Sequence, residues 1–400
     1  MGQFRMLTAG ESHGKGLTMI IEGLPSGLPL AESDISPDLA RRQGGYGRGG
    51  RMKIEKDHAE IMGGVRHGLT LGSPVALWIE NRDWVNWTVK MSIEPVGDEA
   101  EVERVTRMRP GHADLPGAIK YGFDDVRNVL ERASARETAA RVAVGAVAKR
   151  LLSEFGVIFH SHTLSIGSVC SQPKDPIDWD AVEADPVRSA DPAAGEAMVA
   201  AINAAKPDGD TVGGEVEVRV SGLPMGLGSH VHWDRKLDGR IAQAICSINA
   251  FKGVSFGAGF DGTKLRGSQV HDVILPISQW EGLPWRHATN RHGGIEGGIS
   301  TGEEIVVRAA IKPIPTLAHP LPSVDLDTGE EVLAHYERSD VCVVPAGGVV
   351  AEAMVAIVLA DAWLEKFGGD SLPETRANYE RYLATVGPRA IARPDDGRGR

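Results

Sequence analysis

The sequence predicts an α+β protein built mainly from antiparallel strands. Apolar runs bounded by glycine and proline are interleaved with helical patterns, and several of these runs alternate polar and apolar residues. Such alternation is typical of strands with one solvent-facing side, so a doubly wound parallel sheet is the less favoured arrangement. A third observation is an internal echo: Gly-Leu-Pro-Ser-Gly-Leu (23–28) and Gly-Leu-Pro-Met-Gly-Leu (222–227) each follow a predicted strand and precede a predicted helix. This echo favours a duplicated unit.

Individual elements follow from the spacing of apolar residues. Short apolar runs that end at glycine or proline are predicted strands, and longer stretches with apolar residues three and four apart are predicted helices. The last predicted helix stops at Gly368 and Gly369, since glycine readily takes the left-handed conformation that ends helices. The predicted strands are residues 4–9, 17–24, 74–79, 157–166, 215–220 and 304–311, and the predicted helices are residues 36–42, 133–155, 234–251 and 349–367.

Composition limits what the protein binds. The 400 residues carry a formal net charge of −11, so the whole molecule has no electrostatic reason to seek nucleic acid or an anionic membrane. Three scattered cysteines exclude a disulfide framework, and Cys246 and Cys342, which lie in apolar runs, are predicted core residues. The apolar stretch 347–362 contains Glu352 and Asp361, so we predict a buried helix there and not a membrane span. We expect a cytoplasmic protein.

The domain organisation predicted is one catalytic domain over residues 1–387. Its repeated units would cover roughly residues 1–150 and 157–370. The first ten residues hold no apolar stretch of the kind that marks a secretory signal. Residues 388–400, rich in Arg, Asp and Gly, are predicted to form a disordered tail.

A basic, glycine-rich segment at residues 41–51 is the strongest functional signal. Its arginines are Arg41, Arg42, Arg48 and Arg51, and glycines separate most of them. Glycine lets the backbone approach a ligand closely, and guanidinium groups bind carboxylates and phosphates through paired hydrogen bonds. The segment lacks the Gly-Lys-Ser/Thr ending of a Walker loop. We predict a site for a small, multiply anionic ligand, with an RNA-binding segment and a solvated charged loop as alternatives.

Two loop histidines could carry proton chemistry. His13 lies next to glycine after the first strand, where an exposed imidazole can transfer a proton near neutral pH. His112 follows Arg109 in a second basic loop. For either histidine alone, an ordinary surface position is the simpler interpretation. Ser134 is predicted to cap the long helix, and Arg136 in its first turn favours a bound anion there. The histidines have no metal-ligand spacing, so no metal site is predicted.

Further segments complete an ordered set along the chain. A glycine-dense turn precedes the last predicted strand, a loop fixed by two prolines follows it, and an arginine–aspartate pair precedes the last helix. The set consists of Thr-Ala-Gly-Glu-Ser-His-Gly (8–14), Arg-Arg-Gln-Gly-Gly-Tyr-Gly-Arg-Gly (41–49), Arg-Pro-Gly-His-Ala-Asp (109–114), Arg-Ala-Ser-Ala-Arg-Glu-Thr (132–138), Ile-Asn-Ala-Phe-Lys-Gly (248–253), Gly-Gly-Ile-Glu-Gly-Gly-Ile-Ser (293–300), Lys-Pro-Ile-Pro-Thr (312–316) and Arg-Ser-Asp (338–340).

This ordered set resembles the chorismate synthase family over about 360 residues. The resemblance implies a layered β-α-β sandwich with pseudo-duplicated halves, assembled as a homotetramer. It also implies a lyase of the shikimate pathway to aromatic amino acids. Such enzymes convert 5-enolpyruvylshikimate 3-phosphate to chorismate by anti-1,4-elimination of phosphate, and they need reduced FMN although there is no net redox change. The substrate carries two carboxylates and a phosphate, which accounts for the many arginines.

Positions that match the family's motifs imply roles for single residues. His13 would be the acid beside the leaving phosphate, His112 the histidine near flavin N1, and Asp340 the aspartate that manages the proton on flavin N5. Arg42 and Arg48 also match positions tied to NADPH. The implied substrate-binding residues are Ser12, Arg42, Arg48, Arg109, Arg136 and Arg338, and the implied flavin-binding residues are Arg42, Arg48, Arg132, Ala133, Ser134, Asn249, Ala250, Gly297, Lys312, Pro313, Ile314, Pro315, Thr316 and Arg338.

One residue departs from the family pattern. His292 stands beside the glycine-dense turn, where the resemblance leads us to expect a small residue such as alanine. The alternative enzyme class is an FMN-dependent oxidoreductase acting on an anionic substrate. Because the chain has no added domain or sizeable insertion for reducing flavin with NADPH, we expect FMN to be reduced externally, by a flavin reductase for which NADPH is the indirect electron source.

Overall fold

Two antiparallel sheets enclose a layer of helices in the computed structural model, which describes residues 4–49, 56–97, 102–276, 285–337 and 339–387. The first sheet has the strand order β1-β2-β6-β3 and the second has the order β11-β14-β9-β7-β8. Neighbouring strands in both sheets are antiparallel. The bounds are β1 Arg5–Ala9, β2 Gly16–Glu22, β3 Ala59–Gly63, β6 Val75–Glu80, β7 Ile158–Ile166, β8 Val169–Cys170, β9 Gly214–Ser221, β11 Phe251–Phe256 and β14 Ile305–Ile311.

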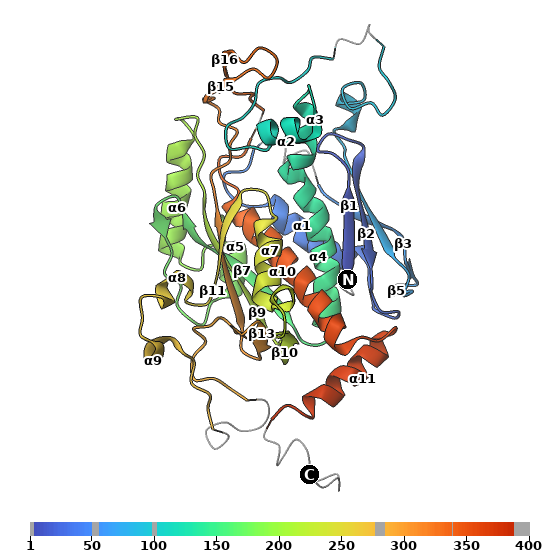
Figure 1. The fold of residues 1–400 in the computed structure, drawn as a ribbon, viewed down its shortest axis with the longest axis vertical. Coiled ribbons are helices and arrows are strands. Elements are labelled where there is room, and N and C mark those ends of the chain that lie inside the picture. Colours follow the sequence, from blue (N-terminus) through green and yellow to red (C-terminus); the bar gives the residue numbers. More distant parts are fainter. Residues whose placement is uncertain (1–3, 50–55, 98–101, 277–284, 338, 388–400) are drawn as a thin grey trace.

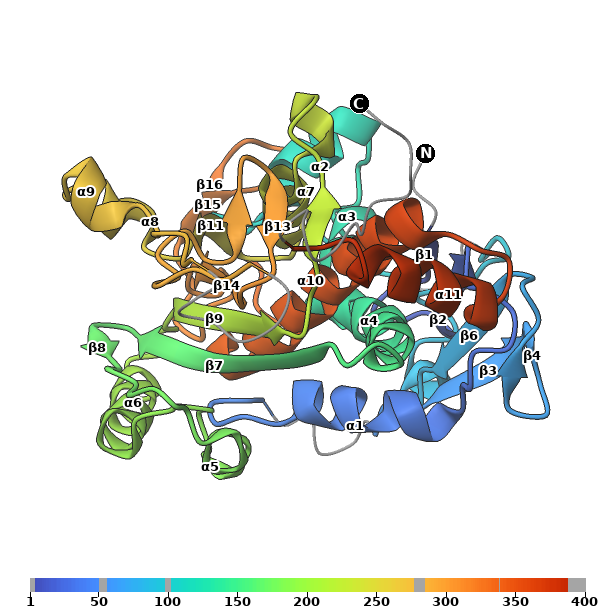
Figure 2. The ribbon, with the colours of Figure 1, turned by 90° about the horizontal axis from the view of Figure 1, so that it is seen from below.

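The helical layer lies between the two sheets (Figure 2). Helix α10 (Val344–Phe367) packs against β7, β9 and β14 of the second sheet and against helix α4 (Thr138–Ser153), which in turn packs against β1 and β2 of the first sheet. Helices α1 (Glu32–Gln43) and α7 (Leu237–Cys246) flank this central pair. The predicted α+β class and the layered β-α-β sandwich implied by the family resemblance are therefore both confirmed.

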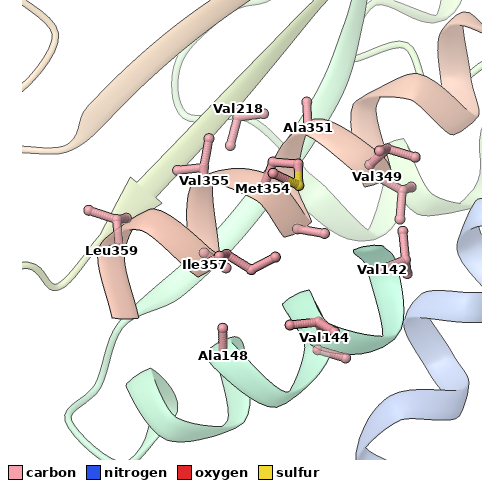
Figure 3. Close-up of a cluster of buried hydrophobic side chains, with 14 of the residues drawn as sticks. Val142, Val144, Ala148, Val218, Val349, Ala351, Met354, Val355, Ile357 and Leu359 are labelled. Atoms are coloured by element: carbon pink, nitrogen blue, oxygen red, sulfur yellow. The ribbon is translucent and has the colours of Figure 1, made fainter. Parts of the chain in front are cut away.

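The contact between α4 and α10 forms the centre of the core. Figure 3 shows Val142, Val144 and Ala148 of α4 facing the apolar side of α10, with Val218 of β9 on its other side. The helices approach each other closely at Gly145: a Cβ added there would lie only 2.3 Å from the Cβ of Ala353. Any larger residue at Gly145 would force these two helices apart, so the sequence needs a glycine in the middle of this helix despite its low helix propensity.

Helix α10 is long and apolar enough to cross a membrane by length and composition alone. However, 89% of its most apolar 18-residue window is buried inside the fold. Glu352, in the middle of the helix, is itself buried and ion-paired with Arg41 and Lys149. The helix is therefore a core helix, as the two acidic residues in this stretch predict.

Shorter elements connect the three layers and cover their edges. Among the described residues, elements that the sequence failed to predict include β3, β11, α2, α6 and α11; helix α6 packs against β7 and β8, and α11 packs against α10. The remaining elements are β4 Val65–Arg66, β5 Leu69–Thr70, β10 Met225–Gly228, β12 Ile295–Glu296, β13 Ile299–Thr301, β15 Pro322–Val324, β16 Glu331–Leu333, α2 Asp114–Tyr121, α3 Arg127–Ala133, α5 Trp179–Ala184, α6 Pro192–Ala205, α8 Gly259–Gly262, α9 Gly267–Val270 and α11 Leu372–Leu383, with single 3-10 turns at Trp84–Asn86, Ala135–Glu137 and Trp233–Arg235.

Two predictions about local structure are wrong. The helix predicted over residues 133–155 is interrupted at Ser134, whose extended backbone (φ −67°, ψ 146°) separates α3 from the turn that leads into α4. Cys246 is exposed, although it was predicted to lie in the core. The buried face of α7 is formed by Leu237, Ile241 and Ile245, and Cys246 follows Ile245 by a rotation of about 100° around the helix, which turns it outward.

The two echoed segments have the same backbone signature. Gly23 and Gly222 have φ of 93° and 80°, and Gly27 and Gly226 have φ of 80° and 102°. These left-handed conformations favour glycine, so the echo reflects one local turn used twice. The duplication of whole units remains a prediction, and the predicted tail at 388–400 lies outside the described residues.

Candidate active site

Helix ends meet at one end of the helical layer. The end of α1 reaches the start of α4, where Arg42 Nε donates a hydrogen bond to the hydroxyl of Thr138 at 2.9 Å. Asn249, just after α7, donates from Nδ2 to the Ala133 carbonyl at 2.6 Å. The loop after α1 also packs against the first turn of α10. The N-termini of α4 and α10 therefore both lie in this region, where their free N–H groups and dipoles favour bound anions.

His13 is held in place by a buried carboxylate. The backbone N–H of His13 donates to Glu131 Oε2 at 2.8 Å, and its Nδ1 lies 2.9 Å from Glu131 Oε1. Trp87 stacks on the imidazole with 3.8 Å between ring centroids, and Arg127 lies over the same indole. Only 12% of the His13 side chain is exposed. The prediction of an exposed loop histidine is therefore wrong, because Trp87, from a loop far away in sequence, covers the ring.

His112 has a similar carboxylate partner. Its Nδ1 lies 2.6 Å from Oδ1 of Asp114, a fully buried carboxylate that also accepts from Arg109 Nε at 2.8 Å. Arg109 in turn donates to the Thr316 hydroxyl at 3.1 Å. Burial alone would raise the pKa of Asp114, but hydrogen bonds from His112 and Arg109 outweigh it and hold the pKa well below its ordinary value. Asp114 is therefore ionised, and it orients both side chains.

A second carboxylate joins two of the predicted substrate arginines. Asp57, whose side chain is 1% exposed, accepts from Arg136 and lies 3.3 Å from Arg42. Both guanidinium groups are buried, and Arg42 also donates to the Ala135 carbonyl at 2.9 Å. Ser134 accepts from the Arg136 N–H at 3.3 Å and so caps the 3-10 turn Ala135–Glu137, not the long helix as predicted, because α4 begins only at Thr138. Asp57 therefore links Arg42 and Arg136 near the start of α4.

The basic segment divides into two parts with different roles. Arg41 turns away from the helix ends and pairs with Asp38, Glu183 and the buried Glu352, so it belongs to the core and not to the site. Arg48 lies 3.2 Å from Asp340, whose other oxygen accepts from the Gly49 N–H at 2.5 Å. This fixed loop does not resemble an RNA-binding arginine–glycine tail, which is disordered. Arg51 lies outside the described residues.

Hydrogen bonds hold three of the predicted flavin-binding residues in place, and two of these residues bond to each other. Arg132 donates to the carbonyls of Gly10 and Thr8 at 3.1 and 3.0 Å. The Lys312 N–H donates to the Ala250 carbonyl at 3.0 Å. Ala250 has φ of 70°, a left-handed conformation that is strained for alanine and is found most often at functional sites.

The side chain of Lys312 reaches back to the His112 loop. Its Nζ donates to the Gly111 carbonyl, while burial, followed by the charge of Lys252, lowers the pKa of Lys312. The loop that follows is fixed by Thr211, which donates to the Ile314 carbonyl at 2.8 Å. The predicted segment with residues Pro313, Pro315 and Thr316 therefore lies beside His112 and Arg109.

Ser12 also lies within this cluster, and its hydroxyl is 3.1 Å from that of Ser134. Gly297 does not. It lies in the β12–β13 turn, where Gly298 accepts from the Leu237 N–H at the start of α7, whereas Asn249 follows the end of that helix. Ten residues separate the two ends of α7, which corresponds to about 15 Å. The flavin contact of Gly297 stays a prediction, and Arg338 lies outside the described residues.

Comparison with known proteins identifies this arrangement. A model of the chorismate synthase family matches residues 4–364. The chain is 59% identical over 389 residues to the chorismate synthase of Moorella thermoacetica, which covers 96% of this chain and 100% of that protein. It is 57% identical over 390 residues to the chorismate synthase of Geobacter sulfurreducens, with 96% and 99% covered. The chain belongs to the chorismate synthase family.

The fold gives the same answer. A crystal structure of chorismate synthase matches with a TM-score of 0.77 and 45% identity, covering 96% of this chain and 98% of that one. The chain is therefore a lyase that eliminates phosphate from 5-enolpyruvylshikimate 3-phosphate to give chorismate, and its family requires reduced FMN. The alternatives of an oxidoreductase and an RNA-binding protein are left without support.

Sequence reasoning did not find the carboxylates that organise the site. Asp57 follows the basic segment without any recognisable motif, and Glu131 lies in a helix one residue before the Arg-Ala-Ser-Ala-Arg-Glu-Thr segment. Trp87 lies in a loop with no periodic pattern. Asp114 and Asp340 do lie within recognisable segments, and the short spacing of Asp114 to Arg109 and His112 is a usable signal.

Proposed function

We propose that the cluster around His13 and His112 is where the phosphate ester and reduced FMN bind. The observation that carries this proposal is that both imidazoles have Nδ1 on a buried carboxylate, Glu131 for His13 and Asp114 for His112. Such contacts fix ring orientation and tautomer, as supporting carboxylates do in other catalytic histidine sites. Surrounding arginines supply the charge needed for a substrate with three anionic groups. The substrate-binding residues we propose are Ser12, Arg42, Arg48, Arg109, Arg136 and Arg338.

His13 is the proposed acid for the departing phosphate. With Nδ1–H directed at Glu131, proton exchange is confined to Nε2, which is what a residue that delivers a proton to a phosphate oxygen requires. The Trp87 stack and the backbone contact to Glu131 hold the ring rigid. A rigid ring lowers the cost of reaching the reactive geometry.

The donor set beside His112 fits a flavin phosphate and ring. Arg132 and Lys312 are cationic, Ser134, Asn249 and Thr316 offer neutral hydrogen bonds, and the remaining proposed contacts are Arg42, Arg48, Ala133, Ala250, Gly297, Pro313, Ile314, Pro315 and Arg338. When bound, reduced FMN supplies the electron that promotes departure of the phosphate and is returned afterwards. We propose that His112 would lie beside N1 of a bound flavin. The carboxylate of Asp340 would accept a proton near flavin N5.

An anaerobic assay tests the proposed site. Protein, 5-enolpyruvylshikimate 3-phosphate and dithionite-reduced FMN are mixed, and chorismate absorbance is followed together with released phosphate. Oxidised FMN without dithionite is the control and should give no turnover. His13→Ala and His112→Ala should each slow elimination by about ten- to ten-thousand-fold, the range of proton-transfer catalysis. Wild-type rates in both variants would remove the assigned roles.

The source of reducing equivalents is a separate part of the proposal. We propose that FMN is reduced by an external reductase and that NADPH acts only through it, although Arg42 and Arg48 match NADPH-linked positions. Incubating the protein aerobically with FMN and NADPH should therefore give no NADPH oxidation that matches turnover.

We also propose a cytoplasmic homotetramer, which light scattering coupled to size-exclusion chromatography tests directly. A monomer or dimer with full activity would contradict the tetramer.

A further inference from the structure

A cluster of possible metal ligands forms where His292 departs from the expected pattern. His271 and Asp272 follow α9, while His292 and Glu296 lie 20 or more residues later, in the glycine-dense turn and β12. Folding brings ligand atoms of Asp272, His292 and Glu296 within 4.8 Å of one another. His271 Nδ1 lies 3.2 Å from His292 Nε2, with the two rings stacked. The sequence shows no metal-binding motif here because His271 and Asp272 lie in one segment and His292 and Glu296 in another.

We propose that Asp272, His292 and Glu296 bind a divalent metal ion of the Zn²⁺ type, and that the exposed side chain of His271 moves to complete the ligand set. Two imidazole nitrogens with two carboxylates and no thiolate form a donor set that suits Zn²⁺ and its first-row neighbours better than Mg²⁺ or Ca²⁺, which prefer oxygen ligands.

The histidine pair has a spacing that suits tetrahedral coordination. A Zn–N bond of about 2.05 Å gives an edge of about 3.3 Å between neighbouring ligand nitrogens, close to the 3.2 Å between His271 and His292. The two ring nitrogens could therefore bind one metal ion after a small rotation of the rings.

Asp272 is already oriented as a ligand. Its Oδ1 accepts from the Thr289 hydroxyl at 2.5 Å and from the Arg291 N–H at 2.8 Å, and its Oδ2 accepts from the His292 N–H at 2.9 Å. The carboxylate keeps a lone pair on Oδ2 that could bind a metal ion. Such supporting hydrogen bonds strengthen metal sites.

A histidine and an arginine lie next to the cluster. His287, whose side chain is 5% exposed, lies with Nε2 4.0 Å from Glu296 Oε2. Arg291 is the nearby cation, and its guanidinium points to the Thr289 hydroxyl at 3.4 Å. Two carboxylates against one arginine leave the cluster anionic, which favours a divalent cation.

Such a metal would fasten one projecting segment to the body. The segment with α8 and α9 projects from the second sheet in Figure 1, and its base is held by the Ala258 N–H, which donates to the Arg291 carbonyl at 2.7 Å. Ligands at residues 271–272 would tie its returning end to the β12–β13 hairpin. Binding to the folded form alone lowers the population of locally open states.

Metal titration of the tag-free, metal-stripped full chain tests this proposal. Zn²⁺ is added in competition with a chromophoric chelator, and Co²⁺ is added separately to follow the visible absorption of a four-coordinate site. One ion should bind per chain. His292→Ala, His271→Ala and Glu296→Gln should each raise the Kd for Zn²⁺ more than about tenfold, since each removes one ligand. His232→Ala should not, because His232 is an exposed histidine bonded to Asp234 elsewhere.

Two further readouts make the result decisive. Zn²⁺ should slow amide hydrogen exchange in residues 259–276 of the wild type and leave it unchanged in His292→Ala. Circular dichroism confirms that each variant is folded, and the exposed positions of His271 and Glu296 make loss of folding unexpected. Absence of stoichiometric binding, or equal Kd values for the wild type, His292→Ala and His232→Ala, would mean an adventitious ion only and would overturn the proposal.

Discussion

Glu131 contacts His13 at two points. The backbone N–H of His13 donates to Glu131 Oε2 at 2.8 Å, and the ring Nδ1 of His13 lies 2.9 Å from Glu131 Oε1. The glutamate is 98% buried and also lies 3.1 Å from Arg127, so its own position is fixed. Asp114 likewise contacts the ring Nδ1 of His112. Each histidine therefore carries its orienting carboxylate on the side away from Nε2, and each carboxylate can be changed without touching the imidazole.

Glu131→Gln should lower kcat by about ten- to a hundredfold, because the amide weakens the hold on His13 Nδ1 without removing the ring. KM for the phosphate ester should change little. The double variant His13→Ala/Glu131→Gln should be no slower than His13→Ala alone, because Glu131 acts through His13. Anaerobic chorismate assays of the four proteins measure this. Multiplicative losses would show that Glu131 acts independently of His13.

Asp114→Asn should impair both turnover and substrate binding, since this carboxylate orients Arg109 as well as His112. It should also destabilise the protein by about 3 kcal/mol, because Arg109 would lose its buried partner. Urea denaturation gives the stability, and the assay gives kcat and KM separately. An increase in KM absent from Glu131→Gln would distinguish the two carboxylates. Unchanged KM in Asp114→Asn would contradict a substrate role for Arg109.

Adjacent arginines at the end of α1 provide a matched pair of variants. Arg41→Gln should lower the free energy of unfolding by about 3 kcal/mol, because Glu352 is buried and would keep only Lys149 as a cationic partner. Its activity per folded molecule should be unchanged. Arg42→Gln should raise KM for the phosphate ester by about tenfold or more, the loss expected for a charged hydrogen bond. The reverse pattern would show that the site assignment is wrong.

This pair also marks the limit of what the sequence could predict. The basic segment, the two histidines and the alternation of polar and apolar residues within the strands could be recognised in the sequence, because motif spacing and side-chain periodicity are local properties. Which arginine faces the site was not visible, since Arg41 and Arg42 differ only by a rotation of about 100° on one helix. The partner that each arginine binds, Glu352 for Arg41 and Asp57 for Arg42, comes from a segment distant in sequence.

The covered state of His13 was unpredictable for the same reason. A loop histidine beside glycine is typically exposed, and only the fold brings Trp87 onto its ring. Conversely, the fold class was predictable because it follows from the two faces of each strand. Motifs thus indicate the candidate site residues, whereas the groups that hold these side chains can be found only from the tertiary structure.

Acid should weaken the second sheet through Glu217, a buried carboxylate on β9. Burial alone would raise its pKa, but hydrogen bonds from His162, Arg219 and Arg308 outweigh it and lower the pKa from 4.5 to about 2. Because the folded pKa is the lower one, the stabilisation is present above pH 4.5 and is lost as the pH falls towards 2. The loss by pH 3 should be about 2 kcal/mol.

Urea denaturation of the wild type and Glu217→Gln at pH 6 and pH 3 measures this contribution. The variant should be less stable at pH 6, because Arg219 and Arg308 lose a charged partner. The difference between the two proteins should shrink by about 2 kcal/mol at pH 3, where the wild-type carboxylate has lost most of its advantage. Taking this difference cancels the acid titration of other carboxylates. A surface control, Glu365→Gln, should show no such change, and a constant difference for Glu217→Gln would mean that this carboxylate does not set the acid response.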